Sequence, residues 1–361
     1  MEPAQRQAND SDRDKRMDWV GAASIVGLSV MILLSLDLGG VVSPWNSPKV
    51  LGLLLGGLVL LAGFIFWEGK GTSIPIMPFR LMNGVSKVSP LVVCFTHGFV
   101  NVSSWYFLPL YFQAVWGASP TYSGVLLMPI VVVQAFVGLA AGGITYRFGW
   151  INQLIWIGMV LMTLGFGLFI HLGTSPSLAG TVLIQVVAAI GVGSSFQAPL
   201  IAYQSAVGTA DMAVATSLFG FIRSLSTSIS VVVGGVVFQN GMAKQKSHLI
   251  SVLGPSLAQN FSASTAAANI FTIHSLPLDQ QVAVKHAYVS SLRGMWAMYA
   301  SVGGLGLVAA LFMKYNALTD RDAGSSAAAA DVIDLRDQAS VPAQPSLHTP
   351  HPVSSPIAES T

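Results

Sequence analysis

The scarcity of charge in the middle of the chain constrains its fold more than any other feature. Between Lys87 and Asp211 the sequence holds a single charged residue, Arg147. Over all 361 residues, Asp, Glu, Lys and Arg make up 9% and apolar residues 53%, whereas soluble domains carry about a quarter charged residues. So few charges cannot cover a surface that faces water. The composition therefore predicts a polytopic membrane protein and excludes a soluble enzyme or a nucleic-acid-binding protein.

Eight apolar segments are long enough to cross a membrane, for which a helix needs about 20 residues. Each is a continuous apolar run, unlike the short alternating stretches of a membrane barrel. The predicted fold class is therefore an all-α polytopic membrane protein with eight transmembrane helices. The predicted spans are Trp19–Leu36, Val50–Trp67, Leu91–Val115, Tyr122–Thr145, Leu154–Leu172, Leu178–Tyr203, Ala213–Phe238 and Val289–Met313.

The distribution of Lys and Arg predicts how the helices are oriented. The first 17 residues hold four basic residues and no apolar run, so we expect no signal peptide. Basic residues recur in the loops on the same side as the termini, whereas the opposite short loops 39–47, 116–120 and 173–177 contain no Lys or Arg. The positive-inside rule then places both termini in the cytoplasm of a multi-pass protein.

The chain divides into regions of different composition. Residues 1–17 form a cytoplasmic N-terminal segment, 18–87 hold two helices and a surface segment with several apolar residues, and 88–315 hold the remaining six helices. A long external loop, 239–278, contains Asn260-Phe261-Ser262, a glycosylation sequon, so we expect Asn260 to be glycosylated. The Ala/Ser/Pro-rich tail 316–361 is expected to be cytoplasmic and disordered.

Polar residues inside the third span need an explanation, because polar groups at membrane depth are costly. His97, Asn101 and Ser104 are spaced by four and three residues and so share one helical face. They either line a water-filled cavity or form interhelical hydrogen bonds. A histidine at this position is also a candidate sensor of a proton gradient.

Two further spans place polar residues near a proline. Gln134 follows Pro129 in the fourth span, and Gln197, Pro199 and Tyr203 lie together in the sixth. Transporters place helix breaks beside their binding sites, although proline is also common in membrane helices generally. The candidate residues of a substrate path are therefore His97, Asn101, Gln134, Gln197 and Tyr203.

The seventh span begins between two charges that cannot meet. Asp211 and Arg223 are separated by about 18 Å of helix rise, so Arg223 must find another partner or reach the membrane surface. Ser226, Ser230 and Gly234 then recur every four residues, and a stripe of small residues lets two helices approach closely. We expect Arg223 and this stripe to serve helix packing or gating.

No pattern in the sequence suits catalysis or a metal site. There is no metal-ligand motif or nucleophile elbow, and the single cysteine, Cys94, excludes a disulfide framework and any multi-cysteine metal site. We therefore expect a protein that is not an enzyme and that needs no metal or cofactor.

One stretch resembles a known family. Residues 106–115 read YFLPLYFQAV and run into Gly-Ala-Ser-Pro at 117–120 and Ser-Gly-Val at 123–125. This resembles the fungal fourteen-helix drug:proton antiporters of the major facilitator superfamily. Residues 75–81, 196–199 and 221–223 are similar to the same family, and the resemblance extends from about Asp18 to Tyr315.

The resemblance implies which helices are present. The first two predicted spans are similar to the linking pair of these antiporters, and the other six to their C-terminal bundle. The six N-terminal helices, with the signature loop and the proton-coupling motifs, have no counterpart here. A degenerate version of the signature-loop motif is present at Gly142, Arg147 and Gly149, with Tyr146 where the family has Asp. By resemblance, Arg147 is expected to contact a neighbouring helix end in the inward-closed state.

The resemblance also implies a function. We expect an efflux transporter of the plasma membrane that exports a small amphipathic organic substrate, such as a toxin, drug or secondary metabolite, driven by the proton gradient across the lipid bilayer. Alternating access needs two bundles, so the expected partner is a six-helix N-terminal half or a full-length permease. The sequence is expected to be either a truncated gene prediction or a true eight-helix protein. The alternative is a non-transporting truncated paralogue that associates with and modulates a full-length permease.

Overall fold

A computed structural model describes residues 18–39, 43–70, 77, 79–175, 177–262 and 265–313. All of them belong to one compact unit of the chain, residues 1–316. The predicted N-terminal segment 1–17 and the predicted tail 316–361 lie outside the described residues, as do residues 71–76 and 78 of the predicted surface segment.

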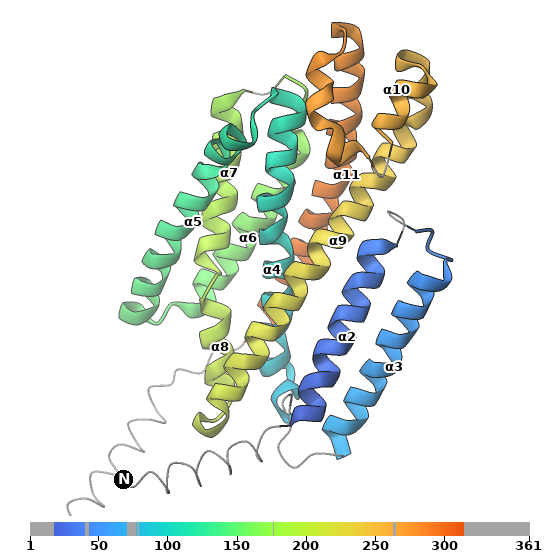
Figure 1. Cartoon of the computed structure of the whole chain (residues 1–361). Coiled ribbons are helices and arrows are strands. Elements are labelled where there is room, and N and C mark those ends of the chain that lie inside the picture. Colours follow the sequence, from blue (N-terminus) through green and yellow to red (C-terminus); the bar gives the residue numbers. More distant parts are fainter. Residues whose placement is uncertain are drawn as a thin grey trace, which may run out of the picture. The chain divides into compact units, whose positions relative to one another are not determined.

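The described residues form long helices joined by short turns (Figure 1). Seven of these helices are long and apolar enough to cross a membrane, and one further apolar helix, Trp19–Ser35, is shorter. The prediction of an all-α polytopic membrane protein is therefore confirmed.

The first two helices pack against each other, and the first of them also packs against α9. They are α2 (Trp19–Leu38) and α3 (Pro48–Lys70). Asp18 holds the pair together at one end, since its carboxylate accepts the Gly21 N–H at 2.8 Å and the indole N–H of Trp67 at 3.0 Å. Gly57 lets the helices approach, because a Cβ there would lie 2.7 Å from the side chain of Ile32.

The remaining transmembrane helices form a six-part bundle in which the sixth predicted span is divided in two. In it α4 packs against α9 and α11, α6 against α7 and α11, and α5 against α7. The helices are α4 (Val85–Tyr111), α5 (Pro120–Phe148), α6 (Ile151–Leu168), α7 (Leu178–Ser194), α8 (Ala198–Ala206), α9 (Met212–Leu253) and α11 (Leu278–Leu311).

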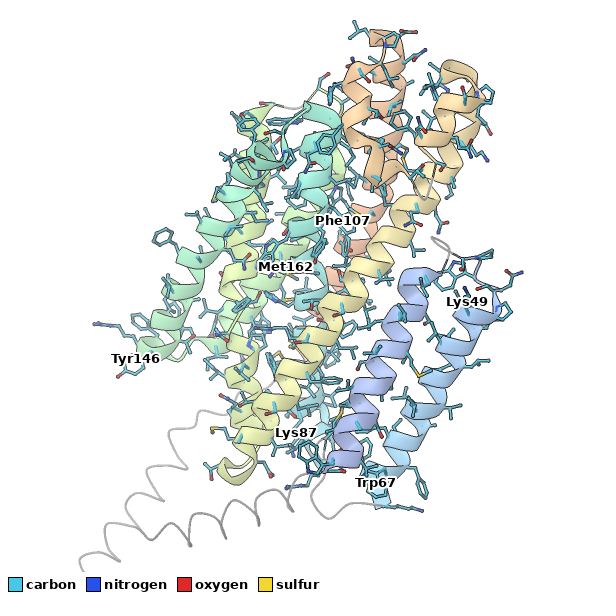
Figure 2. All side chains as sticks on the ribbon, in the orientation of Figure 1. Lys49, Trp67, Lys87, Phe107, Tyr146 and Met162 are labelled. Carbon is cyan, nitrogen blue, oxygen red and sulfur yellow. The ribbon has the colours of Figure 1, made fainter. Side chains whose placement is uncertain are left out.

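Large aromatic and aliphatic side chains fill the centre of this bundle. Trp296 of α11 is buried against Phe166 of α6 and against Phe169 of the short helix that follows it, at ring-centroid distances of 6.2 and 4.9 Å. Figure 2 marks Phe107 and Met162, which are buried inside the bundle, and Tyr146, which projects away from it at the end of α5. Such packing is the main attraction between helices in a membrane, where lipid tails are as apolar as the helices.

Helix α9 continues well beyond the predicted span. The sequence turns polar after Phe238, but the residues that follow are mostly compatible with a helix, and the helix ends only at Gly254, whose φ is +79°. A left-handed glycine ends a helix, and proline favours the first turn of the next one, here α10 (Pro255–Asn260). The predicted loop 239–278 is therefore largely helical, with a 3-10 segment, Ala266–Ser275, before α11.

The connection between α3 and α4 docks on the bundle where it is described. A 3-10 turn, Phe79–Met82, buries Leu81, and the Tyr203 hydroxyl donates to the Leu81 carbonyl oxygen at 3.0 Å. Arg80 forms a bidentate ion pair with Asp211, with N–O distances of 2.6 and 2.7 Å. Asp211 thus has a partner outside its own helix, and this turn is attached to α8 and to the start of α9.

Candidate functional site

A pocket lies between α5 and the interruption that separates α7 from α8. Its volume is about 340 Å³. It contains two of the predicted substrate-path residues and no charged residue, and it is lined by Val131, Gln134, Ala135, Gly138, Leu139, Phe196 and Gln197. It is the place where the described part of the chain brings predicted polar residues of different helices together.

The pocket exists because the sixth predicted span is interrupted. Helix α7 ends at Ser194 and α8 begins at Ala198, with Pro199 in its first turn, where the missing N–H of proline costs no hydrogen bond. Just before the break, Gly193 brings α7 against α5, since a Cβ there would lie 2.7 Å from the Gln134 carbonyl oxygen. The close approach and the break together leave Phe196 and Gln197 facing α5.

Phe196 is held in place by Arg223 of α9. A guanidinium nitrogen of Arg223 donates to the Phe196 carbonyl oxygen at 2.6 Å, and the guanidinium carbon lies 4.4 Å from the centroid of the Phe196 ring. The Phe219 ring lies on the same guanidinium at 5.2 Å. Arg223 therefore has a carbonyl and two aromatic faces as partners, which combines a charge-assisted hydrogen bond with cation–π contact.

His97 lies behind Phe196. It is 1% exposed, and its ring meets the Phe196 ring edge-on with centroids 5.8 Å apart. Its Nε2 lies 3.0 Å from the Val192 carbonyl oxygen. A carbonyl oxygen only accepts, so Nε2 carries a hydrogen, and in the neutral ring Nδ1 is then an acceptor. The described residues provide no partner for Nδ1.

Gln134 is the polar group of the pocket wall with unused bonding capacity. Its Oε1 is buried and has no hydrogen-bond partner among the described residues. Gln197 is exposed and belongs to the opposite wall. Because the Gln134 side chain lines the cavity, rotation of its amide would let this oxygen accept a hydrogen bond from a ligand, while Phe196 offers an aromatic face. The pocket is therefore suited to an uncharged molecule that has a hydrogen-bond donor and an apolar or aromatic part.

Like His97, the last two predicted substrate-path residues do not line this pocket. Asn101 is 7% exposed on α4, and its Oδ1 has no partner in the described part of the chain. Tyr203 is fully buried against Phe219, at a ring-centroid distance of 6.3 Å, and donates its hydroxyl to the Leu81 carbonyl oxygen. Tyr203 thus links α8 to the turn that precedes α4 through this hydrogen bond.

The predicted small-residue stripe of α9 lies against α4 and α11. Gly98 of α4 is so close to Ser226 that a Cβ would collide with the serine hydroxyl. Ser230 donates to the Phe99 carbonyl oxygen, and its own carbonyl accepts from the Tyr299 hydroxyl at 2.8 Å. A Cβ at Gly234 would likewise collide with the Tyr299 hydroxyl.

Arg147 lies on the surface at the end of α5. Its guanidinium carbon is 5.8 Å from the Phe148 ring, and α5 stops two residues later at Gly149, whose φ is +67°. The neighbouring Tyr146 side chain is 95% exposed. The exposed Arg147 side chain is therefore accessible to another helix or another protein outside the described residues.

Sequence reasoning placed Phe196 in a family-like motif but not among the substrate-path candidates, although it supplies the aromatic wall. Its signal was its position just before Gln197-Ala198-Pro199, where an interrupted helix exposes its last side chains. It also did not identify Gln185 of α7, which is 1% exposed and whose Oε1 has no partner among the described residues. A glutamine inside an apolar run was the available signal.

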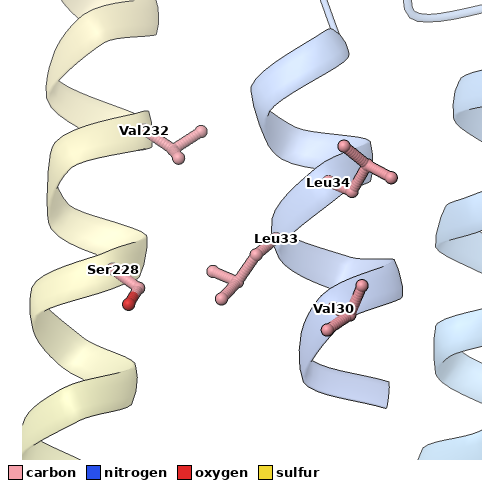
Figure 3. A pocket seen from close by; sticks show the side chains of 5 residues that line it. All are labelled: Val30, Leu33, Leu34, Ser228 and Val232. Carbon is pink, nitrogen blue, oxygen red and sulfur yellow. The ribbon is translucent and has the colours of Figure 1, made fainter. Parts of the chain in front are cut away.

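A second pocket, between α2 and α9, is apolar. Its volume is about 380 Å³, and Figure 3 shows Leu33 pointing across it towards Ser228 and Val232. The Ser228 hydroxyl already donates to the Ser224 carbonyl oxygen at 3.0 Å. This groove offers apolar contact but no free hydrogen-bond donor, so it is a weaker candidate for a functional site than the α5 pocket.

The chain is similar to several curated fungal proteins. It is 39% identical over 297 residues to the MFS-type transporter ppz2 of Metarhizium majus, which covers 82% of this chain and 51% of that protein. It is 38% identical over 305 residues to the efflux pump dotC of Dothistroma septosporum (84% and 52%), and 30% identical over 313 residues to the efflux pump FUS6 of Gibberella fujikuroi (85% and 55%).

No protein-family model matches the chain. The chain spans about half the length of the curated relatives that it matches. The resemblance inferred from residues 106–125 agrees with these relatives, because they carry the name of the same superfamily or are called efflux pumps. The chain is therefore homologous to fungal transporters of the major facilitator superfamily, over a stretch that spans about half of their length.

Proposed function

We propose that the chain is one bundle of a major facilitator efflux transporter and that the α5 pocket lies on its substrate path. The observation that carries this proposal is the buried, unpartnered amide oxygen of Gln134, placed opposite the Phe196 ring at a helix break. An unsatisfied buried polar atom costs roughly 1–3 kcal/mol, and a substrate that donates a hydrogen bond there would recover that cost.

The pocket chemistry supports a particular substrate class. The lining residues include no charged group, and most of them are apolar. The substrate is accordingly a small amphipathic organic molecule, such as a toxin, drug or secondary metabolite, with an uncharged hydrogen-bond donor near an aromatic or apolar part. The relatives named efflux pumps support outward transport, and a transporter of this type would be driven by the proton gradient rather than act as an enzyme.

Transport would require a second bundle. Alternating access works by two bundles that rock about a site at their interface. On α5, Met128, Phe136 and Leu139 are 54–75% exposed, so this helix has a broad uncovered surface beside the pocket. The partner is a six-helix N-terminal half, in the same polypeptide or from a full-length permease.

The orientation in the plasma membrane follows from the loops. The ends that carry the Arg80–Asp211 pair and Arg147 are cytoplasmic, with both chain termini on that side, and α10 is external. Figure 1 places α10 at the opposite end of the bundle from α8. Asn260, at the end of α10, is exposed and is the glycosylated residue.

Reconstitution tests this proposal. The chain would be placed in vesicles with an imposed proton gradient, alone and together with the N-terminal half of a relative, and export of the fluorescent amphipathic probe rhodamine 6G would be followed. We expect export only with both halves, and a reduced rate for Gln134→Leu. Strong export by the chain alone would contradict the need for a second bundle. Assembly of the halves without export of a chemically varied panel would contradict the transport role and favour a modulator of a full-length permease.

A further inference from the structure

A polar cavity between α9 and α11 lies far from the α5 pocket. Its volume is about 430 Å³. Half of its lining residues lie on α9 beyond the predicted span, one lies on α9 inside that span, and the other three belong to α11. The lining residues are Val237, Asn240, Gly241, Lys244, Gln245, Ser290, Ser291 and Gly294.

Helix packing shapes this cavity. Gly241 lies against α11 so closely that a Cβ there would be 2.7 Å from Ser291 Cβ. One turn further along α9, the Gln245 amide donates to the Ser290 hydroxyl oxygen at 3.3 Å. The Ser291 hydroxyl donates to the Ala287 carbonyl oxygen at 2.7 Å. Two rigid helices therefore form the walls.

The groups left free in the cavity suit an anion. Ser290 accepts from Gln245, so its own hydrogen remains available, and the Asn240 amide and the Lys244 ammonium add further donors. In the described part of the chain, no carboxylate lies within salt-bridge distance of Lys244. The surrounding sequence is also basic, since residues 239–313 contain Lys244, Lys246, Lys285 and Arg293 but a single acidic residue, Asp279.

The cavity lies at the depth of lipid headgroups. Helix α9 starts at Met212, next to the Asp211 that pairs with Arg80 at one membrane surface. At 1.5 Å per residue, Asn240 and Lys244 are about 42 and 48 Å further along the helix axis. A bilayer with its headgroups is about 40–45 Å thick, and helix tilt shortens the projected distance. Lys244 is thus at the opposite headgroup layer.

We propose that this cavity is a binding site for a phosphate ester. In it the Lys244 ammonium pairs with the phosphate, and Asn240 and Ser290 donate hydrogen bonds to its oxygens. The phosphate belongs either to an anionic phospholipid of the adjacent leaflet or to a soluble phosphate ester. The site is independent of the proposed transport function, because none of its residues line the α5 pocket.

Lipid binding to the purified full chain tests the site. Native mass spectrometry would measure the affinity for phosphatidylglycerol and for zwitterionic phosphatidylcholine, and sn-glycerol 1-phosphate would be added as a soluble competitor. The variant is Lys244→Gln. The matched control is Lys246→Gln, which removes the same charge two residues away, outside the lining of the cavity.

We expect Lys244→Gln to weaken phosphatidylglycerol binding by at least about fivefold, because a charge-assisted hydrogen bond is lost, and Lys246→Gln to change it by less than about twofold. If glycerol phosphate competes with the lipid, the site binds the free ester. If glycerol phosphate does not compete, the site is specific for the lipid. Equal losses in the two variants would show diffuse surface attraction and overturn the proposal. Equal affinity of the wild type for the two lipids, combined with no competition by glycerol phosphate, would also overturn it, because both proposed sources of the phosphate would then be excluded.

Discussion

Arg223 of α9 and Phe196, between α7 and α8, are joined in two ways. The guanidinium donates to the Phe196 carbonyl oxygen at 2.6 Å and lies 4.4 Å from the centroid of the Phe196 ring. The interruption of a helix leaves carbonyl groups without their usual N–H partners, and one of them receives a charged donor from another helix. Arg223 therefore stabilises the break and orients the aromatic wall of the α5 pocket at the same time.

Replacing Arg223 by Ala should destabilise the protein by about 1–2 kcal/mol, because a charged hydrogen bond and its aromatic contacts are lost. Denaturant unfolding in detergent would measure the change. Arg147→Ala is the matched control, since that guanidinium is exposed and its recorded contact within the described residues is the ring of its neighbour Phe148; it should cost less than about 0.5 kcal/mol. Equal losses would show that Arg223 does not hold the break.

Gln134→Leu should separate function from stability. If the amide oxygen serves a ligand, its removal should raise the free energy of unfolding of the unliganded protein by up to about 1–3 kcal/mol, because a buried unsatisfied acceptor is lost, while probe export by the two-half transporter falls by about tenfold, the equivalent of one lost hydrogen bond. Unfolding curves and vesicle transport would be measured on the same preparations. Marked destabilisation with unchanged transport would assign Gln134 to the protein interior instead.

The Arg80–Asp211 pair should contribute modestly and in a salt-dependent way. The Arg80 side chain is 68% exposed and that of Asp211 is 18% exposed, so we expect each of Arg80→Gln and Asp211→Asn to cost at most about 1 kcal/mol. The double variant should cost less than the sum of the two. The coupling should shrink between about 0.05 M and about 0.5 M NaCl, and a coupling unaffected by salt would contradict an ion pair at the membrane surface.

Glycines of the bundle should respond to alanine according to the space around them. At Gly191 of α7 an added Cβ would lie 2.6 Å from a main-chain carbon of Leu161, so Gly191→Ala should cost about 1–3 kcal/mol. At Gly143 of α5 nothing lies within 4 Å, and the same change should stabilise the helix by up to about 1 kcal/mol. Thermal unfolding of both variants would show whether α6 and α7 pack this closely.

Glycosylation reports the orientation of α10. In a fungal host we expect an endoglycosidase to increase the gel mobility of the wild-type chain but to leave Asn260→Gln unchanged. Asn101-Val102-Ser103 also matches a sequon. Asn101→Gln should keep the shift, because this second sequon lies inside α4, where no transferase reaches it. A wild-type chain that the enzyme does not shift would leave the external position of α10 without support.

Apolar length predicted the order of the membrane helices well, although seven rather than eight of the described helices are long enough to span, and the first, Trp19–Ser35, is shorter. Their ends depend on other forces. Hydropathy suggested that the helix that became α9 ends at Phe238. The helix instead continues through polar residues to Gly254, where the backbone geometry of the glycine ends it. The sequence also indicated that Arg223 could not pair with Asp211, and the structure gives Arg223 a carbonyl partner and Asp211 the partner Arg80.

The candidate site was only partly predictable. Gln134 and Gln197 were identified because polar residues are costly at membrane depth, and they line one pocket. Tyr203 looked equivalent, yet it lies on the buried side of α8, because the break changes which face α8 presents. Which side of a helix faces a neighbour depends on contacts far apart in the sequence, such as that between Tyr203 and Leu81, and a residue pattern along one helix contains no information about them.

The break after α7 gives its two pieces separate environments. Helix α7 packs on α5 and α6, whereas α8 packs on α4, α6 and α9. Whether a substitution in α7 is tolerated therefore depends mainly on different packing partners from those that limit substitutions in α8. Related proteins can therefore differ around Phe196 and Gln197, and so in the molecules that they recognise. The close contacts between α6 and α7, formed at glycines such as Gly191, can stay unchanged. An interrupted helix thus allows recognition to diversify without the scaffold having to be rebuilt.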